Sequence, residues 1–357
     1  MKQIRFGMVG AGWRAAFYLR IARALPDRFA VTGVVVRNAE KRERFARVWG
    51  CPVHASLEEM LAADDPLFVV TSVPWPVNPG LVKELVQRGK PVLSETPPAL
   101  DLAQMTDLYR TVGERGGTVQ VAEQYFLQPH HAARLEVIRS GVIGTVSQAQ
   151  ISAAHGYHGI SLIRKALGVG FEGVMIRARA FTSPLVDGPG RDGPPDAERL
   201  RDSVQEFFWL EFGDQLGFMD FTGDQYFSWI RDNRVLIRGE RGEIVDNRVS
   251  YLKDYRTPVL LELRRREWGR EGNLEGVGLQ SVHLGDDRVY ANPLSPAALS
   301  DDEIAVGTCL LRMAGCALGG DPFYPLAEAC QDHYLNLLCR RALETGEAVR
   351  SEPQEWA

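Results

Sequence analysis

Residues 1–25 read MKQIRFGMVGAGWRAAFYLRIARAL, and this stretch organises the rest of the chain. The apolar run Ile4–Val9 has the length of a buried strand, and the residues that follow it, GAGWRA at 10–15, fit the pattern G-x-G-x-x-A. Apolar residues then recur at the spacing of a helix, from Tyr18 to Leu25. Strand, glycine turn and helix therefore follow one another in the order of a dinucleotide-binding unit.

Each small residue of this turn has a physical purpose in such a unit. Gly10 permits the sharp turn, Gly12 lets the backbone approach a pyrophosphate, and Ala15 lets the helix lie close to the strand. The first N–H groups of the helix are unpaired and point at the anion. The same pattern also fits an ordinary tight turn, but the flanking strand and helix favour a coenzyme site. We therefore expect coenzyme contacts from Gly10, Ala11, Gly12, Trp13 and Arg14.

Composition limits the class of protein. The 357 residues suffice for two domains, and an apolar content of 45% supports hydrophobic cores. A net charge of −5 argues against a general nucleic-acid surface, and no apolar run reaches the ~18 residues of a membrane span. The five cysteines form no CxxC pair, and the early strand leaves no room for a signal peptide. We expect a cytoplasmic protein with reduced cysteines and with neither nucleic-acid nor membrane partners.

The order of the secondary-structure patterns predicts two domains. Apolar strands and amphipathic helices alternate up to residue 123, which predicts an α/β domain at 1–123 with a doubly wound parallel sheet of the Rossmann type. From residue 174 to about 263 several strands follow in succession, with helices predicted at 129–139, 160–167, 300–318 and 325–344. Residues 124–357 are therefore expected to form an α+β domain, an open and mainly antiparallel sheet carrying helices. Two segments, 183–196 and 267–296, are predicted as loops, either lying over a cleft between the domains or plain surface loops.

Five short stretches in a fixed order carry a family resemblance. They are the glycine turn at 10–15, GKPVLSETP at 89–97, SGVIG at 140–144, HGISLIRKALG at 158–168 and GERGE at 239–243. With them, nearly the whole chain resembles the Gfo/Idh/MocA family of NAD(P)-dependent oxidoreductases. The resemblance implies hydride transfer to or from a sugar or related polyol, and a homodimer or homotetramer formed through the C-terminal sheet.

The chain departs from the family pattern at positions that bear on the chemistry. Thr96 stands where the family usually has a lysine, and Ala154 stands where an aspartate usually precedes the active-site histidine by four residues. His158 falls on the histidine itself, so one of these three groups remains. Two other functions therefore stay open: a redox-assisted glycosidase or lyase with tightly bound NAD, and a non-catalytic nucleotide-binding protein.

The catalytic candidates lie in one run, AHGYH at 154–158. His158 is the expected acid/base, because an imidazole with a pKa of ~6.5 transfers protons near neutrality. Tyr157 and His155 are candidates for a supporting or substituting role, although His155 fits a capping or surface residue almost as well. No third ligand stands at a nearby spacing, so we expect no metal site.

The remaining coenzyme contacts are expected where predicted strands end, because ligands of parallel sheets bind at that edge. At the end of the second strand, Val36, Arg37 and Asn38 offer no carboxylate for a ribose hydroxyl, and a guanidinium can bind a 2′-phosphate. This favours NADP over NAD. The other expected contacts are Ser72, Val73, Pro74, Trp75, Glu95, Thr96 and Gln124.

A mixed aromatic and polar segment at 221–231 fits either a sugar-binding face or a subunit interface. The interface is the favoured interpretation for most of it, with Asp220 and Asp224 kept as candidate substrate contacts. Lys165 could replace the missing lysine charge, but an ordinary solvated helix lysine fits it better.

Overall fold

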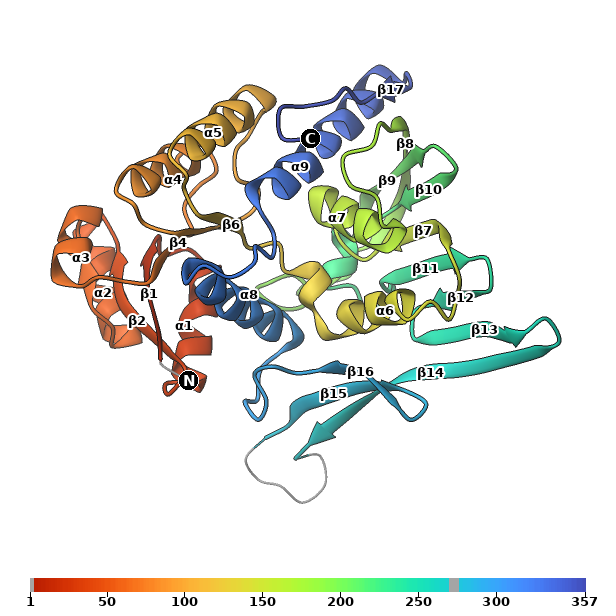
Figure 1. The fold of residues 1–357 in the computed structure, drawn as a ribbon, viewed down its shortest axis with the longest axis horizontal. Helices are drawn as coiled ribbons and strands as arrows, with labels where there is room; N and C mark the ends of the chain where they lie inside the picture. Colours follow the sequence, from red (N-terminus) through yellow and green to blue (C-terminus); the bar gives the residue numbers. More distant parts are fainter. Residues whose placement is uncertain (1–2, 270–275) are drawn as a thin grey trace.

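The computed structural model describes residues 3–269 and 276–357, which form two sheets joined by helices (Figure 1). The first sheet has six parallel strands in the order β3-β2-β1-β4-β5-β6. These strands are β1 (Ile4–Val9), β2 (Phe29–Val35), β3 (Val53–His54), β4 (Phe68–Thr71), β5 (Val92–Ser94) and β6 (Val119–Val121). The strand order reverses at β1, which lies between β2 and β4, and ligands of such sheets bind beyond the strand ends at this point. The predicted Rossmann-type sheet is confirmed.

Five helices connect these strands. They are α1 (Ala15–Ala24), α2 (Ala39–Trp49), α3 (Leu57–Ala63), α4 (Asn78–Gln87) and α5 (Leu102–Glu114). Side-chain caps begin three of them, because Asn38, Ser56 and Asp101 each accept a hydrogen bond from a backbone N–H in the first turn. Between helices and sheet, fully buried Phe6 and Phe68 stack with ring centroids 5.8 Å apart.

The second sheet has eleven strands and is mainly antiparallel, as predicted. Its order is β16-β15-β14-β13-β12-β11-β7-β10-β9-β8-β17, and within the described residues only β10 and β7 pair in parallel. The strands are β7 (Val146–Ser152), β8 (Met175–Val186), β9 (Leu200–Phe212), β10 (Gln215–Met219), β11 (Arg234–Gly239), β12 (Gly242–Val245), β13 (Arg248–Asp254), β14 (Thr257–Trp268), β15 (Gly278–Leu284), β16 (Asp287–Ala291) and β17 (Val349–Arg350).

The remaining helices lie between the two sheets (Figure 1). They are the 3-10 turns η1 (Tyr125–Leu127) and η2 (Gly223–Tyr226), and α6 (Pro129–Arg139), α7 (Gly156–Leu167), α8 (Asp301–Ala317) and α9 (Leu326–Thr345). α7 packs on β7 and β10, while α8 contacts α1 and α9 contacts both β6 and β8. These contacts hold the two sheets against each other. Within the described ranges, no helix is long and apolar enough to cross a membrane.

The loop prediction for 267–296 was wrong, and the one for 183–196 was wrong for its first four residues while 187–196 lies between strands as predicted. Most of the segment at 267–296 forms the end of β14 and the hairpin β15–β16, while residues 270–275 lie outside the described part. The segment at 183–196 begins inside β8, so its first four residues extend a strand. Both stretches lie at or near the edge of a sheet with many exposed positions, so they lack the apolar pattern that identifies buried strands. The helix predicted from residue 160 begins at Gly156, which puts Tyr157 and His158 in its first turn.

Candidate active site

A cavity of about 1550 Å³ opens at the carboxyl edge of the parallel sheet and extends to α7. Every residue that the sequence proposed for coenzyme binding or catalysis lines it. From the parallel sheet and its turns come Gly10, Ala11, Gly12, Trp13, Arg14, Val36, Arg37, Asn38, Ser72, Val73, Pro74, Trp75, Glu95 and Thr96, and from the following segments Gln124, His155, Tyr157 and His158. One cavity therefore brings together all the sequence-predicted coenzyme and catalytic residues.

The two glycines of the first turn meet different surroundings. Gly10 has φ +117°, and a Cβ added there would lie 1.9 Å from the Ser72 carbonyl oxygen, so the fold itself requires glycine. A Cβ added at Gly12 would meet nothing within 4 Å. The chain thus leaves open space at the position where a dinucleotide pyrophosphate approaches the backbone, and the turn fits that group.

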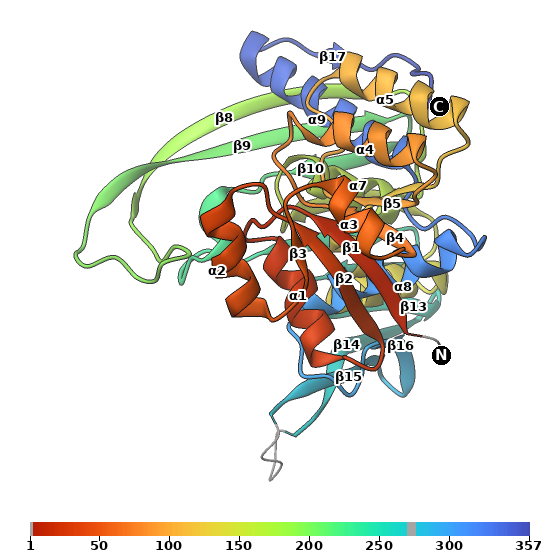
Figure 2. The same cartoon turned by 90° about the vertical axis from the view of Figure 1, so that its left-hand side faces the viewer.

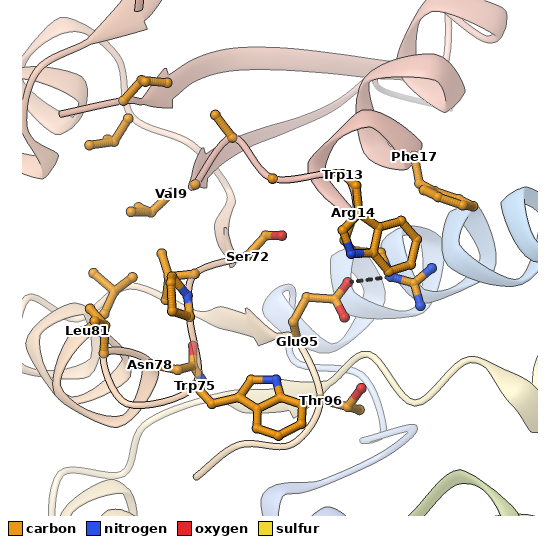
Figure 3. A pocket seen from close by; sticks show the side chains of 18 of the residues that line it. Val9, Trp13, Arg14, Phe17, Ser72, Trp75, Asn78, Leu81, Glu95 and Thr96 are labelled. Atoms are coloured by element: carbon orange, nitrogen blue, oxygen red, sulfur yellow. Dashed lines mark ion pairs between the residues drawn. The ribbon is translucent and has the colours of Figure 1, made fainter. Parts of the chain in front are cut away.

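Arg14 and Glu95 form an ion pair beside this turn (Figure 3). The Arg14 Nε lies 3.7 Å from the Glu95 carboxylate, which also accepts a hydrogen bond of 2.6 Å from the buried Tyr18 hydroxyl. Nη1 of Arg14 is buried without a hydrogen-bond partner. Glu95 therefore anchors α1 to the end of β5 and leaves an unused cationic donor at the cavity.

The end of the cavity beside the carboxyl end of β2 carries positive charge. Exposed Arg37 and Lys41 line it together with Ser56 and Glu58. Asn38 uses its side chain to accept a hydrogen bond of 2.8 Å from the Lys41 backbone N–H, so it caps α2. The sequence analysis named Arg37 but missed Lys41 and Ser56, which come from a helix surface and from the cap of α3.

A buried asparagine connects the strand ends beneath the cavity. Asn78 accepts a hydrogen bond of 2.7 Å from the Thr71 hydroxyl and donates to Ser94 and to the Pro98 carbonyl. It joins β4, β5 and the turn after β5, where the Thr96–Pro97 peptide bond is cis.

At the other end of the cavity, His158 forms a buried pair with Glu123. The His158 Nδ1 lies 2.5 Å from Oε2 of Glu123, and the two residues are 4% and 1% exposed. Burial raises the pKa of Glu123 to about 8 and lowers that of His158, so the neutral forms are favoured. Because Nδ1 is engaged, Nε2 is the ring nitrogen left for a ligand.

Glu123 was missed by the sequence analysis, although a signal existed. It directly follows β6, and the carboxyl ends of parallel strands meet at the ligand-binding edge. Its partner is 35 positions away, and no pattern in the sequence connects the two.

Aromatic residues surround this pair. Tyr157 packs against His158, and Tyr125 lies 4.5 Å from the His158 ring between centroids. The Tyr226 hydroxyl bonds to His155 Nδ1 and lies 3.3 Å from the Tyr125 hydroxyl. Burial lowers the pKa of His155 to about 4, so this imidazole is neutral near pH 7.

The other residues singled out in the sequence differ in whether they line the cavity. Of the segment 221–231, Tyr226 and Phe227 line the cavity. Asp220 accepts hydrogen bonds from Arg234 and Gln205, and Asp224 from Arg201 and Ser203, and neither acid lines the cavity. Lys165 lies over the Tyr324 ring and 3.9 Å from Glu328, outside the cavity lining, as an ordinary helix lysine.

Comparison with known proteins agrees with this architecture. Residues 4–123 match the family described as "Oxidoreductase family, NAD-binding Rossmann fold". Inositol 2-dehydrogenase of Rhizobium meliloti is 26% identical over 152 residues, which cover 42% of this chain and 45% of that protein. The chain matches less than half the length of the curated relatives, 38–45% in each case.

Solved structures match over the whole chain at low identity. A myo-inositol dehydrogenase from Corynebacterium glutamicum superposes with a TM-score of 0.67 at 18% identity, covering 99% of this chain and 100% of that one. The WlbA dehydrogenase from Bordetella pertussis, solved with NADH and UDP-GlcNAcA, gives 0.65 at 18% identity and covers 99% of each. The likeness extends to both sheets. Residues 4–123 are therefore similar to the Gfo/Idh/MocA family of oxidoreductases, and the whole chain shares the fold of these solved structures.

Proposed function

We propose that the protein is an NAD(P)-dependent oxidoreductase that transfers a hydride to or from a sugar or related polyol, with His158 as the acid/base. The observation that carries the proposal is that one cavity contains both features. The buried His158–Glu123 pair lies at one end of it, and the glycine turn lies at the other end. The named relatives, which include inositol 2-dehydrogenase, support the substrate class. When bound, a nicotinamide coenzyme supplies the hydride donor or acceptor.

The pair moves one proton in each direction of the reaction. In the protonated form of the pair, the Glu123 carboxyl O–H donates to Nδ1 of His158, and the His158 Nε2–H faces the ligand. Nε2–H can then protonate a substrate oxygen while the carboxyl proton of Glu123 passes to Nδ1. In its deprotonated form, Nδ1–H donates to the carboxylate and Nε2 carries a free lone pair, which can accept the hydroxyl proton of an alcohol. The carboxylate also fixes the tautomer of the imidazole.

Tyr157 supports this step as a neutral hydrogen-bonding group. Burial raises the pKa of its phenol well above the usual value, and the neighbouring Thr96 hydroxyl offsets only part of that effect. A neutral phenol donates a hydrogen bond to a reacting oxygen without acting as its base. Tyr157 with Thr96 thus replaces the polarising role of the family's lysine, while neutral His155 positions Tyr226.

The positive adenosine end favours NADP as the coenzyme. Arg37 supplies a bidentate donor for a 2′-phosphate, and Lys41 and Ser56 add a cation and a hydroxyl at the same end. Glu58 lines the region as well, so the preference rests on an excess of positive over negative side chains.

The chain would work as two domains in a cytoplasmic homodimer or homotetramer. Residues 1–123 carry the coenzyme turn and residues 124–357 carry His158 and the mixed sheet. Exposed apolar side chains on that sheet support association through it: Phe181, Val204, Trp209 and Leu260.

Coenzyme titration followed by a substrate panel tests the proposal. Fluorescence titration should show NADPH binding more tightly than NADH, and a panel of inositols, aldoses and sugar acids should contain a compound that changes the absorbance of the reduced nicotinamide. Failure of both coenzymes to bind would overturn the proposal. Retention of nucleotide through gel filtration, with turnover that needs none added, would favour the redox-assisted glycosidase or lyase.

A further inference from the structure

The ribbon formed by β8 and β9 carries an arginine to the coenzyme end of the cavity. These two strands extend beyond the rest of the mixed sheet as a curved ribbon (Figure 2). In the segment that joins them, Arg191 lines the cavity that contains the glycine turn. The Arg191 guanidinium carbon lies 3.9 Å from the centroid of the Trp13 ring and 5.9 Å from that of Phe227.

A tight turn holds Arg191 at this position. The Gly190 N–H donates to the Gly193 carbonyl over 2.9 Å, and the Gly193 N–H donates back over 3.2 Å. Arg191 is one of the two residues that this pair of bonds encloses, so its backbone is constrained.

Side chains fasten the end of the ribbon to η2. Arg201 donates to Asp187 over 2.9 Å and also to Asp224, which accepts from Ser203 as well. Burial acts to raise the pKa of Asp224, but the hydrogen bonds from Ser203 and Arg201 outweigh it and lower that pKa. Asp224 is therefore charged near neutrality and anchors the segment that carries Arg191.

The charges around Trp13 are unbalanced. Arg14 and Arg191 both contact the Trp13 ring, at 5.0 and 3.9 Å from its centroid, and Arg14 has Glu95 as an acidic partner. None of the ion pairs among the described residues includes Arg191. An arginine stacked on an aromatic ring keeps its N–H groups free for an anion, which it binds with paired donors.

We infer that Arg191 binds the pyrophosphate of the coenzyme from the mixed-sheet side of the cavity. Trp13, on which it stacks, directly follows Gly12, where the turn has open space for that group. Because its guanidinium lies 3.9 Å from the Trp13 ring centroid, directly beside the glycine turn, Arg191 is placed for the pyrophosphate. The inference rests on the proposed coenzyme site, and it makes the second sheet a direct contributor to coenzyme affinity.

Binding measurements on an Arg191→Ala variant test this contact. Fluorescence and calorimetric titrations should show Kd rising about tenfold, by a similar factor for NADPH, NADH and ADP-ribose, since a charge-assisted hydrogen bond is lost in each case. ADP-ribose contains the pyrophosphate and lacks the nicotinamide, so its affinity reports contacts to the pyrophosphate without contacts to the nicotinamide. An Arg199→Ala variant, which removes an exposed arginine from the same segment outside the cavity lining, should bind as the wild type does.

The outcomes distinguish this inference from the proposed function. If the wild-type protein binds coenzyme and Arg191→Ala binds all three ligands equally well, the inference fails while the function stands. A loss confined to NADPH and NADH, with ADP-ribose unchanged, would also overturn it. Binding of none of the ligands by the wild type would instead contradict the coenzyme site itself.

Discussion

The two ends of the cavity are built in different ways. The proposed coenzyme end uses short runs of neighbouring residues, each directly after a strand of the parallel sheet, such as 10–14, 36–38 and 72–75. The proposed proton-transfer end is assembled from single side chains on separate segments: Glu123 after β6, His158 on α7 and Tyr226 on η2. Backbone geometry thus decides the first end, and side-chain packing between distant segments decides the second.

The two ends also differ in electrostatics. Exposed Arg37 and Lys41 face the adenosine end, whereas Glu123 and His158 are buried and favoured in neutral forms. Salt screens exposed charges and affects buried pairs less. We therefore expect ionic strength to change coenzyme affinity, and pH to change the chemical step.

The variant His158→Asn should show the largest difference between the effect on the chemical step and the effect on coenzyme binding. Loss of the acid/base should lower kcat by about 1000-fold, within the range for general acid–base catalysis. Coenzyme Kd should stay near wild type, because the proposed contacts to the pyrophosphate and adenosine come from other residues, at the glycine turn and after β2. Steady-state kinetics and fluorescence titration measure the two quantities. His130→Asn, a histidine outside the cavity lining, should leave both unchanged, and equal losses of kcat and affinity in His158→Asn would indicate a structural histidine.

The pH dependence should report the Glu123–His158 pair. Because the raised pKa of Glu123 is about 8, the deprotonated base accumulates above that pH, so alcohol oxidation should rise with pH through about 8. Ketone reduction needs the protonated pair and should fall over the same range. Profiles of kcat in both directions measure the effect.

Glu123→Gln removes that ionisation while keeping the size of the side chain. It should lower kcat by about 100-fold and abolish the step near pH 8. Glu136→Gln, at a half-buried position of α6 outside the cavity lining, is the control. An unchanged profile in Glu123→Gln would show that another group sets the pH dependence.

The contrast between the ends explains how far the sequence could predict the structure. The glycine turn and the alternating pattern located the coenzyme end because they encode local geometry. Glu123 and Arg191 were missed because their roles depend on His158 and Trp13, which packing brings close across 35 and 178 positions. Lys41 was missed for a simpler reason, since an exposed helix lysine carries no distinguishing signal.

Substitutions of Gly10 and Gly12 should affect different properties, the stability of the fold in the first case and the affinity for the coenzyme in the second. Gly10→Val should lower the free energy of unfolding by at least about 2 kcal/mol, because φ is positive and the new Cβ would meet the Ser72 carbonyl. Gly12→Val should leave the melting temperature nearly unchanged and weaken coenzyme binding about 10- to 100-fold, because its side chain fills space that the pyrophosphate needs. Thermal melts and titrations distinguish them, and tight coenzyme binding by Gly12→Val would place the pyrophosphate elsewhere.

The smallest expected effect concerns the choice between the two coenzymes. Arg37→Ala should weaken NADPH about tenfold and leave NADH nearly unchanged, because only NADPH carries the 2′-phosphate that a guanidinium binds. In the wild type, raising the salt concentration should reduce the difference between the affinities for NADPH and NADH, because Arg37 is exposed and its charge is screened. Arg44→Ala, on the same helix surface as Lys41 but outside the cavity lining, controls for a general loss of positive charge. If the ratio of the two dissociation constants is the same in Arg37→Ala and in the wild type, Arg37 does not select the coenzyme, and Lys41 with Ser56 becomes the remaining source of any preference for NADP.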